Sequence, residues 1–400
     1  MPNYISRKII NLSQENCNIV PIETNKKNIL AIISYPFLPA TTGGEISTLN
    51  ILRYLSFKHT VTVFTVEPYS SNLQLPTSNF ELIFGMPFKT SRYINFFLIG
   101  RLQKIIEEKN IDLLFFDQPW FGWLMLMLKI FTKKKIFLRS NNIEYLRFKS
   151  MGKWFWQMLY IYEKWTYRMA DLVIFVSEVD RQKAIYEFDL DESKTLLTPY
   201  GIELTESPIK NQDTRFKIQD FYKINSKEKI LLFFATMNYA PNYEAVEFIA
   251  EKIYPLLKQN EDFKFKILIC GKNLPQQIQK KLLDKTEIKY CGFVDDIEEY
   301  IDAADVMINP ILSGGGVKTK AIDTLARNKT VISTKTGAEG IDQNVCGNKL
   351  IIIPDTDWNA FAKAIFSTID RNETIPTTFF ETYSWKNIIE KLSVRLEKLS

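Results

Sequence analysis

Pro310-Ile-Leu-Ser-Gly-Gly-Gly-Val-Lys-Thr-Lys-Ala-Ile-Asp323 follows an apolar run, Asp305–Asn309, that predicts a short buried strand. Its glycines permit close backbone approach, and the pattern after them predicts a helix. The free N–H groups at a helix start form an anion site. Lys318 and Lys320 oppose the helix macrodipole there, at a cost of about 0.3–1 kcal/mol each unless an anion neutralises them. The stretch therefore predicts a bound phosphate.

The predicted helix places Lys318 near the middle of its buried arc, which is formed by Val317, Ala321, Ile322, Leu325 and Ala326. A lysine there should emerge over the carboxyl edge of a parallel sheet, where ligands of such sheets bind. The alternative is that Lys318 and Lys320 extend to water at the end of the helix and bind nothing.

Apolar strands alternate with helical patterns along the whole chain, which predicts an α/β fold with parallel sheets. The length of 400 residues favours two domains. The strands are expected at Asn28–Ser34, Thr60–Thr65, Ile111–Phe116, Lys135–Leu138, Leu172–Val176, Thr195–Thr198, Ile230–Ala235, Phe263–Cys270, Ile288–Cys291, Val306–Asn309, Thr330–Thr334 and Leu350–Ile353. We expect an extension at 1–27, a first domain at 28–205, a polar linker at 206–228, a second domain at 229–375, and a C-terminal helix at 376–400 that packs back on the first domain.

The composition excludes several classes of protein. A net charge of +5 argues against an obligate nucleic-acid binder and suits anionic substrates. The four cysteines lie far apart without nearby histidines, so neither zinc nor a disulfide framework is predicted, and a cytoplasmic protein is expected. The longest apolar stretch, Pro119–Phe131, is shorter than the roughly 20 residues that span a bilayer.

Several motifs together resemble glycosyltransferase family 4, and in particular its GT-B-fold members that build bacterial surface polysaccharides. They are Pro39–Glu45, Thr198–Glu203, Phe234–Asn242, Gly292–Asp296, Gly314–Asp323 and Thr336–Ile341. The resemblance implies two Rossmann-like domains that face an interdomain cleft. It also implies retaining transfer of a sugar from a nucleoside diphosphate donor to a glycan or lipid-linked acceptor, without a metal ion or cofactor, in polysaccharide or lipopolysaccharide biosynthesis.

The resemblance assigns roles to particular residues. Gly43 and Gly44 would lie near the diphosphate, and the turn at Val294 would meet the nucleobase through its backbone. Two family glutamates that hold the sugar and the ribose correspond to Gly315 and Asp323. The expected donor site comprises Gly43, Gly44, Val294, Gly314, Gly315, Gly316, Lys318, Lys320 and Asp323.

The sequence departs from the family in three places. Gly315 cannot replace a glutamate, and Met237–Asn242 lacks the usual arginine and lysine. Gln118 and Asn141 stand where many members have a histidine near the reacting carbon. Cations lower the barrier when a diphosphate leaves. We therefore expect Lys318 first and Lys320 second to supply that charge, with Gly44 and Arg139 as further catalytic candidates.

Other side chains allow two interpretations. Asp323 either binds the ribose or pairs with Lys320 and Arg327 on its own helix. Arg139 follows a strand and is expected at the mouth of the cleft, with Glu144 and Asn141 as acceptor contacts. His59, the only histidine, is expected to have a structural role.

The stretch Lys153–Arg168 is rich in aromatic and basic residues, which is typical of an interfacial helix at the cytoplasmic face of the inner membrane, although a buried helix would also be aromatic. Two rival functions remain open. A sugar-nucleotide epimerase on the same fold would need an acid–base cluster. A non-catalytic nucleotide-sugar-binding subunit would explain the missing glutamate at Gly315.

Overall fold

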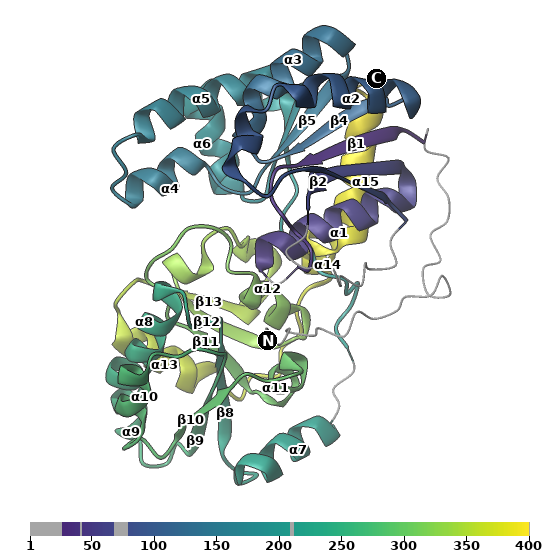
Figure 1. Cartoon of the computed structure of the whole chain (residues 1–400). Helices are drawn as coiled ribbons and strands as arrows, with labels where there is room; N and C mark the ends of the chain where they lie inside the picture. Colours follow the sequence, from purple (N-terminus) through teal and green to yellow (C-terminus); the bar gives the residue numbers. More distant parts are fainter. Residues whose placement is uncertain (1–25, 41, 68–78, 209–211, 400) are drawn as a thin grey trace. The chain divides into compact units, whose positions relative to one another are not determined.

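The computed structural model describes residues 26–40, 42–67, 79–208 and 212–399 (Figure 1). They form two compact units. The N-terminal unit contains the described residues up to Glu203 and those from Tyr383 onward, and the C-terminal unit contains the described residues of Leu204–Thr382. Of the extension predicted at 1–27, only Lys26 and Lys27 lie within the described residues. No described helix combines the length and apolarity that crossing a bilayer requires.

The described part of the N-terminal unit contains a parallel sheet with strand order β3-β2-β1-β4-β5-β6-β7. Its strands are β1 (Asn28–Ile33), β2 (Thr60–Val66), β3 (Glu81–Met86), β4 (Leu113–Asp117), β5 (Lys135–Ser140), β6 (Leu172–Phe175) and β7 (Thr195–Leu197). The edge strand β3 was not predicted, because its half-exposed sequence carries a glutamate and a glycine among its apolar residues.

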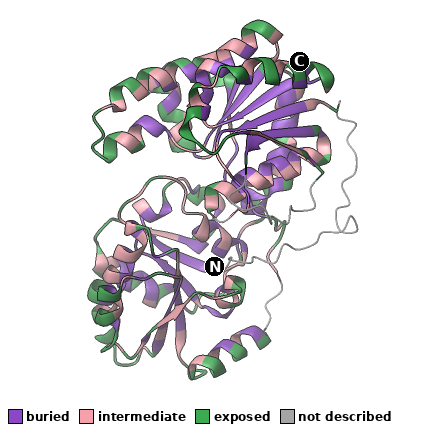
Figure 2. Cartoon of the chain, in the orientation of Figure 1, coloured by how far each residue is buried: buried purple, intermediate pink, exposed green. Residues whose placement is uncertain are grey.

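Alternate strand residues pack against different helix layers, as the period of two requires. Leu30 and Ile32 belong to a core with α2 (Phe97–Glu108), α3 (Gly122–Thr132), α4 (Glu144–Ser150), α5 (Trp156–Met169) and α6 (Glu178–Phe188). Ile29 and Ile33 belong to a second core with α1 (Gly43–Lys58) and α15 (Trp385–Glu397). Figure 2 shows that both sheets are lined by buried residues.

The described part of the C-terminal unit contains a second parallel sheet, ordered β10-β9-β8-β11-β12-β13. Its elements are α7 (Gln212–Tyr222), β8 (Lys229–Phe234), α8 (Ala240–Phe248), α9 (Tyr254–Lys258), β9 (Phe265–Cys270), α10 (Gln276–Leu282), β10 (Ile288–Gly292), α11 (Ile297–Ala303), β11 (Val306–Asn309), α12 (Thr319–Ala326), β12 (Thr330–Thr334), β13 (Leu350–Ile353), α13 (Trp358–Thr368) and α14 (Thr377–Tyr383). Two parallel sheets covered by helices confirm the predicted α/β class.

The prediction of a polar linker at 206–228 needs correction, because this range contains α7. Ile218 of α7 lies in a core beside β8. Arg215 also holds Asp305 with two hydrogen bonds of 3.0 Å. The helix was not predicted because its composition is largely polar, and only a narrow apolar stripe packs against the rest of the C-terminal unit.

The C-terminal segment forms two helices, α14 and α15, where one was expected. Ile202 N–H donates to Tyr383 O at 2.7 Å, and Trp385 N–H donates to Ile202 O at 3.0 Å. A Cβ on Gly201 would lie 2.4 Å from the Trp385 ring, so this close crossing requires glycine. Helix α15 thereby packs beside α1 in the N-terminal unit.

The strand order reverses between β1 and β4 in one sheet and between β8 and β11 in the other. Loops leave the carboxyl ends of such neighbouring strands in opposite directions, and ligands of open α/β sheets bind there. Gly43–Gly44 follows β1 and Gly314–Gly316 follows β11. Each glycine motif therefore lies at the reversal point of its own sheet.

Candidate functional site

The glycine loop of the C-terminal unit, residues Gly314–Gly316, connects β11 to α12. Gly314 and Gly316 have φ angles of 85° and 79°, a region that favours glycine. Below the loop, the buried Asn309 amide donates to Ser333 Oγ at 3.0 Å and to Gly337 O at 2.9 Å. These bonds fasten the end of β11 to the neighbouring strand and give the loop a rigid base.

Lys318 does not extend over the sheet edge as predicted. It precedes α12, and its Nζ donates to Gly314 O at 2.6 Å and Gly316 O at 2.8 Å. Burial lowers the pKa of this ammonium, while Glu339 opposes the shift. The left-handed glycines turn their carbonyls towards the lysine, so Lys318 closes the loop on itself.

Lys320 lies in the first turn of α12 and has a different environment. Its Nζ is buried and has no hydrogen-bond partner among the described residues. The Phe233 ring centroid lies 4.3 Å away. Burial, and secondly the Lys318 charge, lower the pKa of Lys320 to about 7. A buried lysine nitrogen without a hydrogen-bond partner is costly and uncommon, and Lys320 is the lysine of this helix start that meets that description.

Asp323 lies half-buried one turn beyond Lys320 on α12. Arg327, one of its two expected partners, holds Asp302 at 2.7 Å through Nε and Glu298 at 2.9 Å through a terminal nitrogen. Both acceptors belong to α11, so this guanidinium links two helices.

The loop after β8 borders the glycine loop. A Cβ on Gly314 would lie 2.5 Å from Tyr239 Oη and 3.0 Å from Pro241 Cγ. A Cβ on Gly315 would meet nothing within 4 Å. Tyr239, which is 50% exposed, was not singled out from the sequence, although its segment had been noted for lacking cations.

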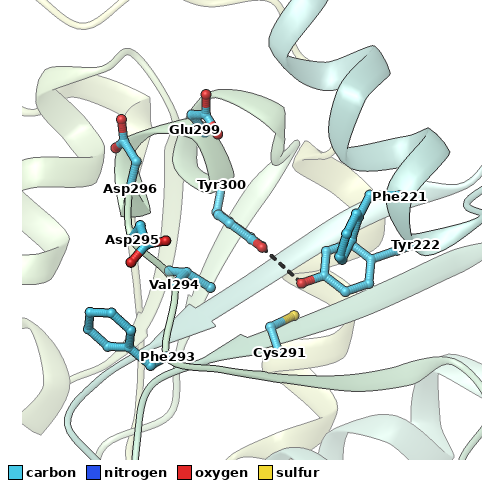
Figure 3. A pocket seen from close by; sticks show the side chains of 9 residues that line it. All are labelled: Phe221, Tyr222, Cys291, Phe293, Val294, Asp295, Asp296, Glu299 and Tyr300. Carbon is cyan, nitrogen blue, oxygen red and sulfur yellow. Dashed lines mark hydrogen bonds between the residues drawn. The ribbon is translucent and has the colours of Figure 1, made fainter. Parts of the chain in front are cut away.

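Val294 lines a pocket of about 370 Å³ in the C-terminal unit (Figure 3). The other lining residues are Phe221, Tyr222, Cys291, Phe293, Asp295, Asp296, Glu299 and Tyr300. Tyr222 and Tyr300 join their hydroxyls at 2.8 Å across it. This turn follows β10, three strands from β11, which corresponds to roughly 14 Å along the carboxyl edge.

Gly43 and Gly44 form the first turn of α1. Thr42 and Glu45 cap this helix reciprocally: Thr42 N–H donates to Glu45 Oε2 at 2.9 Å, and Glu45 N–H lies 3.4 Å from Thr42 Oγ1. A Cβ on Gly44 would meet nothing within 4 Å. Gly44 therefore presents open backbone beside a capped helix end.

Arg139 is buried, which corrects its predicted place at the mouth of a cleft. Its Nε donates to Asp117 Oδ1 at 2.8 Å, and a terminal nitrogen donates to Thr48 Oγ1 at 2.5 Å. Tyr35 Oη donates to Asp117 Oδ2 at 2.5 Å, and burial followed by this carboxylate raises the pKa of Tyr35. The cluster fastens β4 and β5 to α1, so Arg139 positions the helix that begins with the glycine pair.

Gln118 and Asn141 follow β4 and β5. Gln118 has φ 78° and ψ 150°, a conformation normally confined to glycine. Its Oε1 and the Oδ1 of Asn141 are buried without a partner among the described residues. Strain and unpaired amide oxygens together indicate positions that are maintained for something other than stability.

Glu144 is also buried, which corrects its expected role as an acceptor contact. Its carboxylate accepts from Arg147 Nε at 2.7 Å. The backbone N–H groups of Glu144 and Tyr145 donate to Glu163 at 2.9 and 2.7 Å. Burial raises the pKa of Glu163 to about 8. Glu163 therefore caps α4. The sequence did not indicate this role, because Glu163 lies 19 residues beyond Glu144.

His59 lies just before β2, at the amino edge of the sheet. Its Nε2 lies 3.1 Å from Ser393 Oγ, and burial and nearby lysines lower its pKa to about 4. A neutral histidine that joins α15 to the end of α1 has a structural role, as expected.

Two Asp-x-Asp sequences occur, at 189–191 and 355–357. Asp191 and Asp357 accept N–H groups at the starts of short helices. Asp189 pairs with Arg168, and Asp355 accepts from Thr336. Within the described ranges, no three histidine, cysteine or carboxylate side chains gather in a way that could hold a metal.

Comparisons with known proteins agree with these features. A family model described as "Glycosyl transferases group 1" matches residues 228–371, and one described as "Glycosyltransferase Family 4" matches residues 41–206. A Klebsiella pneumoniae protein, "Uncharacterized 44.6 kDa protein in cps region", is 24% identical over 67% of this chain and 68% of its own length.

Solved glycosyltransferase structures share the fold. A Rickettsia africae glycosyltransferase has a TM-score of 0.70 at 18% identity, covering 94% of this chain and 99% of its own. Anabaena HepE in complex with UDP has a TM-score of 0.70 at 12% identity, covering 92% and 99%.

Proposed function

Because the chain belongs to the glycosyl transferases of group 1 and family 4 and has their GT-B fold, we propose that it moves a sugar from a nucleoside diphosphate donor to a glycan or lipid-linked acceptor. Its likeness to a Klebsiella protein of a cps region supports a role in cell-surface polysaccharide or lipopolysaccharide synthesis.

The observation that carries the donor assignment is the buried, unpartnered ammonium of Lys320 at the start of α12. A diphosphate bound there would accept hydrogen bonds from the free N–H groups at the start of the helix. Its negative charge would also be neutralised by the ammonium of Lys320. Lys318 would contribute indirectly, by holding the glycine loop through its carbonyls.

The proposed reaction breaks the bond between the anomeric carbon and the diphosphate oxygen, and forms a bond from that carbon to an acceptor oxygen, which loses its proton. Retention of anomeric configuration is part of the proposal. The departing diphosphate gains negative charge, and a preorganised cation at that point lowers the barrier. Lys320 supplies this charge from the protein itself, so we propose that transfer needs neither a metal ion nor a cofactor.

The remaining donor contacts follow the same edge of the sheet. Asp323 would accept the ribose hydroxyls, and the Val294 turn would meet the base. The spacing of roughly 14 Å between the ends of β10 and β11 suits a nucleoside diphosphate. Gly43 and Gly44 would approach the diphosphate with backbone alone. A lipid-linked acceptor would bring the enzyme to the cytoplasmic face of the membrane.

One observation favours a second function. Gly315 offers no carboxylate for the transferred sugar, and its surroundings are open. A subunit that binds a nucleotide sugar without transferring it would tolerate that loss.

Turnover assays with UDP, GDP, ADP and dTDP sugars test the proposal. The wild-type protein should release a nucleoside diphosphate from one donor, and Lys320→Met should lower that rate by about 10²–10³-fold. Lys280→Met, a change at an exposed lysine of α10, is the matched control and should have no effect. Donor binding without turnover would identify the binding subunit. Full activity of Lys320→Met would refute the assignment.

A further inference from the structure

The glycine loop of the C-terminal unit is packed at one glycine and open at the next. A Cβ on Gly314 would lie 2.5 Å from Tyr239 Oη and 3.0 Å from Pro241 Cγ, so the start of α8 fills the space beside this residue. A Cβ on Gly315 would meet nothing within 4 Å. A sugar joined to a diphosphate at the start of α12 therefore has room over Gly315 rather than over Gly314.

Helix α8 brings a carboxylate to this loop. Ser313 Oγ donates to Glu244 Oε2 at 3.4 Å, which is a long and therefore weak hydrogen bond. Gly315 lies two residues beyond Ser313, which is at most about 7 Å along the chain. The start of α8 is itself fastened, because Asn242 Nδ2 donates to Thr236 O at 2.8 Å. The structure thus holds a carboxylate close to the open space over Gly315.

Glu244 differs from the two glutamates that follow it on the same helical stretch. Glu247 and Glu251 both pair with Lys281, at 2.7 and 2.8 Å. Across the described ranges, no ion pair joins Glu244 to a cation, and its bond to Ser313 is the weak one given above. Glu244 can therefore accept hydrogen bonds from a ligand without first giving up a countercharge.

On the basis of the proposed function, we infer that Glu244 binds the hydroxyl groups of the transferred sugar and selects a neutral sugar over an acidic one. Sugar hydroxyls donate hydrogen bonds, and a carboxylate accepts them at two oxygens. Such charge-assisted bonds are about twice as strong as neutral ones. The same carboxylate repels a hexuronate, whose own carboxylate would enter the site, and this repulsion supplies specificity.

The contact with Ser313 offers a purely structural role for Glu244, and the two roles differ in what they affect. A glutamate that only supports the glycine loop would matter equally for every ligand of that loop. A glutamate that binds the sugar matters for a nucleotide sugar and not for the nucleoside diphosphate alone. The inference concerns binding, so it applies whether or not transfer follows.

Calorimetric titration of the full-length protein separates these roles. UDP, GDP, ADP and dTDP are titrated first, followed by the hexose and hexuronate conjugates of the one that binds best. Glu244→Ala should lower the affinity for the hexose conjugate at least about tenfold and leave the affinity for the nucleoside diphosphate unchanged. The hexuronate conjugate should bind the wild type at least about fivefold more weakly than the hexose conjugate, and Glu244→Ala should reduce this difference.

Two further variants serve as controls. Glu247→Ala removes the neighbouring carboxylate that pairs with Lys281, and it should leave both affinities unchanged. Gly315→Glu combined with Glu244→Ala returns a carboxylate to the same space from the loop itself. Because a side chain at Gly315 meets no neighbour, this double variant should recover part of the lost affinity for the hexose conjugate.

Three results would overturn the inference while the proposed function stands. They are an unchanged affinity of Glu244→Ala for the hexose conjugate, an equal loss for the conjugate and the nucleoside diphosphate, and equal binding of hexose and hexuronate conjugates by the wild type. A wild-type protein that binds none of these nucleotides would instead refute the proposed function, and the inference with it.

Discussion

Two buried cations lie near the two glycine motifs, and their partners differ. Arg139, in the N-terminal unit, donates to Asp117 and Thr48 at 2.8 and 2.5 Å. Lys320, in the C-terminal unit, has a buried ammonium with no hydrogen-bond partner in the part of the chain that the structure describes. A cation whose partners are already present stabilises the fold. A cation that lacks them is available for an anionic ligand.

Removing the paired cation should have the largest effect. Arg139→Met leaves Asp117 buried without its countercharge, and we expect a loss of about 3–5 kcal/mol in the free energy of unfolding. Urea denaturation measures it. The double variant Arg139→Met with Asp117→Leu should lose less than the single one, because no charge remains uncompensated. A single variant as stable as the wild type would show that the cluster does not hold the fold together.

Removing the unpaired cation should change stability in the opposite direction. Below pH 7, where the side chain of Lys320 is charged, Lys320→Met eliminates a buried charge without a hydrogen-bond partner, so the ligand-free protein should gain about 1–3 kcal/mol in urea denaturation. The gain should shrink when a nucleoside diphosphate is added, because the ligand stabilises only the wild type strongly. Destabilisation of the ligand-free variant would mean that Lys320 already has a partner and that the two cations are alike.

The glycine loop offers a comparison between adjacent positions. Gly314→Ala forces a side chain into φ 85° and places its Cβ 2.5 Å from Tyr239 Oη, so we expect a loss of roughly 1–2 kcal/mol. Gly315→Ala enters open space and should stay within about 0.5 kcal/mol of the wild type. Thermal unfolding of the two variants measures the difference. Equal melting temperatures would show that the loop does not require its left-handed turn.

A substitution at Gln118 tests whether the strained backbone conformation of this residue is needed for ligand binding. Gln118→Gly relieves a φ of 78° and should stabilise the protein by about 1 kcal/mol while turnover falls. Asn110→Gly relieves a φ of 48° between α2 and β4 and should leave turnover unchanged. If Gln118→Gly lowered stability and kept full activity, Gln118 would be a structural residue.

The sequence predicted the local patterns well and the long-range contacts poorly. The period of the apolar residues predicted most strands of both sheets, and the glycine motifs predicted the loops at Gly43–Gly44 and Gly314–Gly316. Each of these signals lies within a few neighbouring residues. The sequence placed Lys318 before Lys320 as the phosphate contact, and it did not indicate that Lys318 Nζ donates to the carbonyls of the glycine loop, because the glycine dihedral angles that allow these bonds are not visible in the sequence. The pairing of Arg139 with Asp117 joins residues 22 positions apart, and no local pattern encodes it.

Helix α7 and Glu163 show the same limit. The polar segment Gln212–Tyr222 forms helix α7, and two of its side chains, Arg215 and Ile218, contact residues of the C-terminal unit that are distant in the sequence. Glu163 caps α4 from the following helix. Conversely, the aromatic stretch Lys153–Arg168 was recognised from composition, but only the structure shows which of its residues are exposed.

Proton uptake on ligand binding tests the role of Lys320 most directly. Its pKa of about 7 lies below that of an unfolded lysine, so above pH 7 the folded protein holds this side chain neutral. Unfolding then takes up a proton, and stability of the ligand-free protein should rise between pH 7 and the unfolded pKa. A bound diphosphate should raise the pKa of Lys320 again.

Calorimetric titration at pH 8 with the nucleoside diphosphate that binds best, in two buffers of different ionisation enthalpy, counts the protons exchanged. The wild type should take up close to one proton, with affinity falling up to about tenfold for each further pH unit. Lys320→Met should take up none. Binding to the wild type without proton uptake, or equal uptake by both proteins, would contradict the assignment of Lys320 to the donor phosphate.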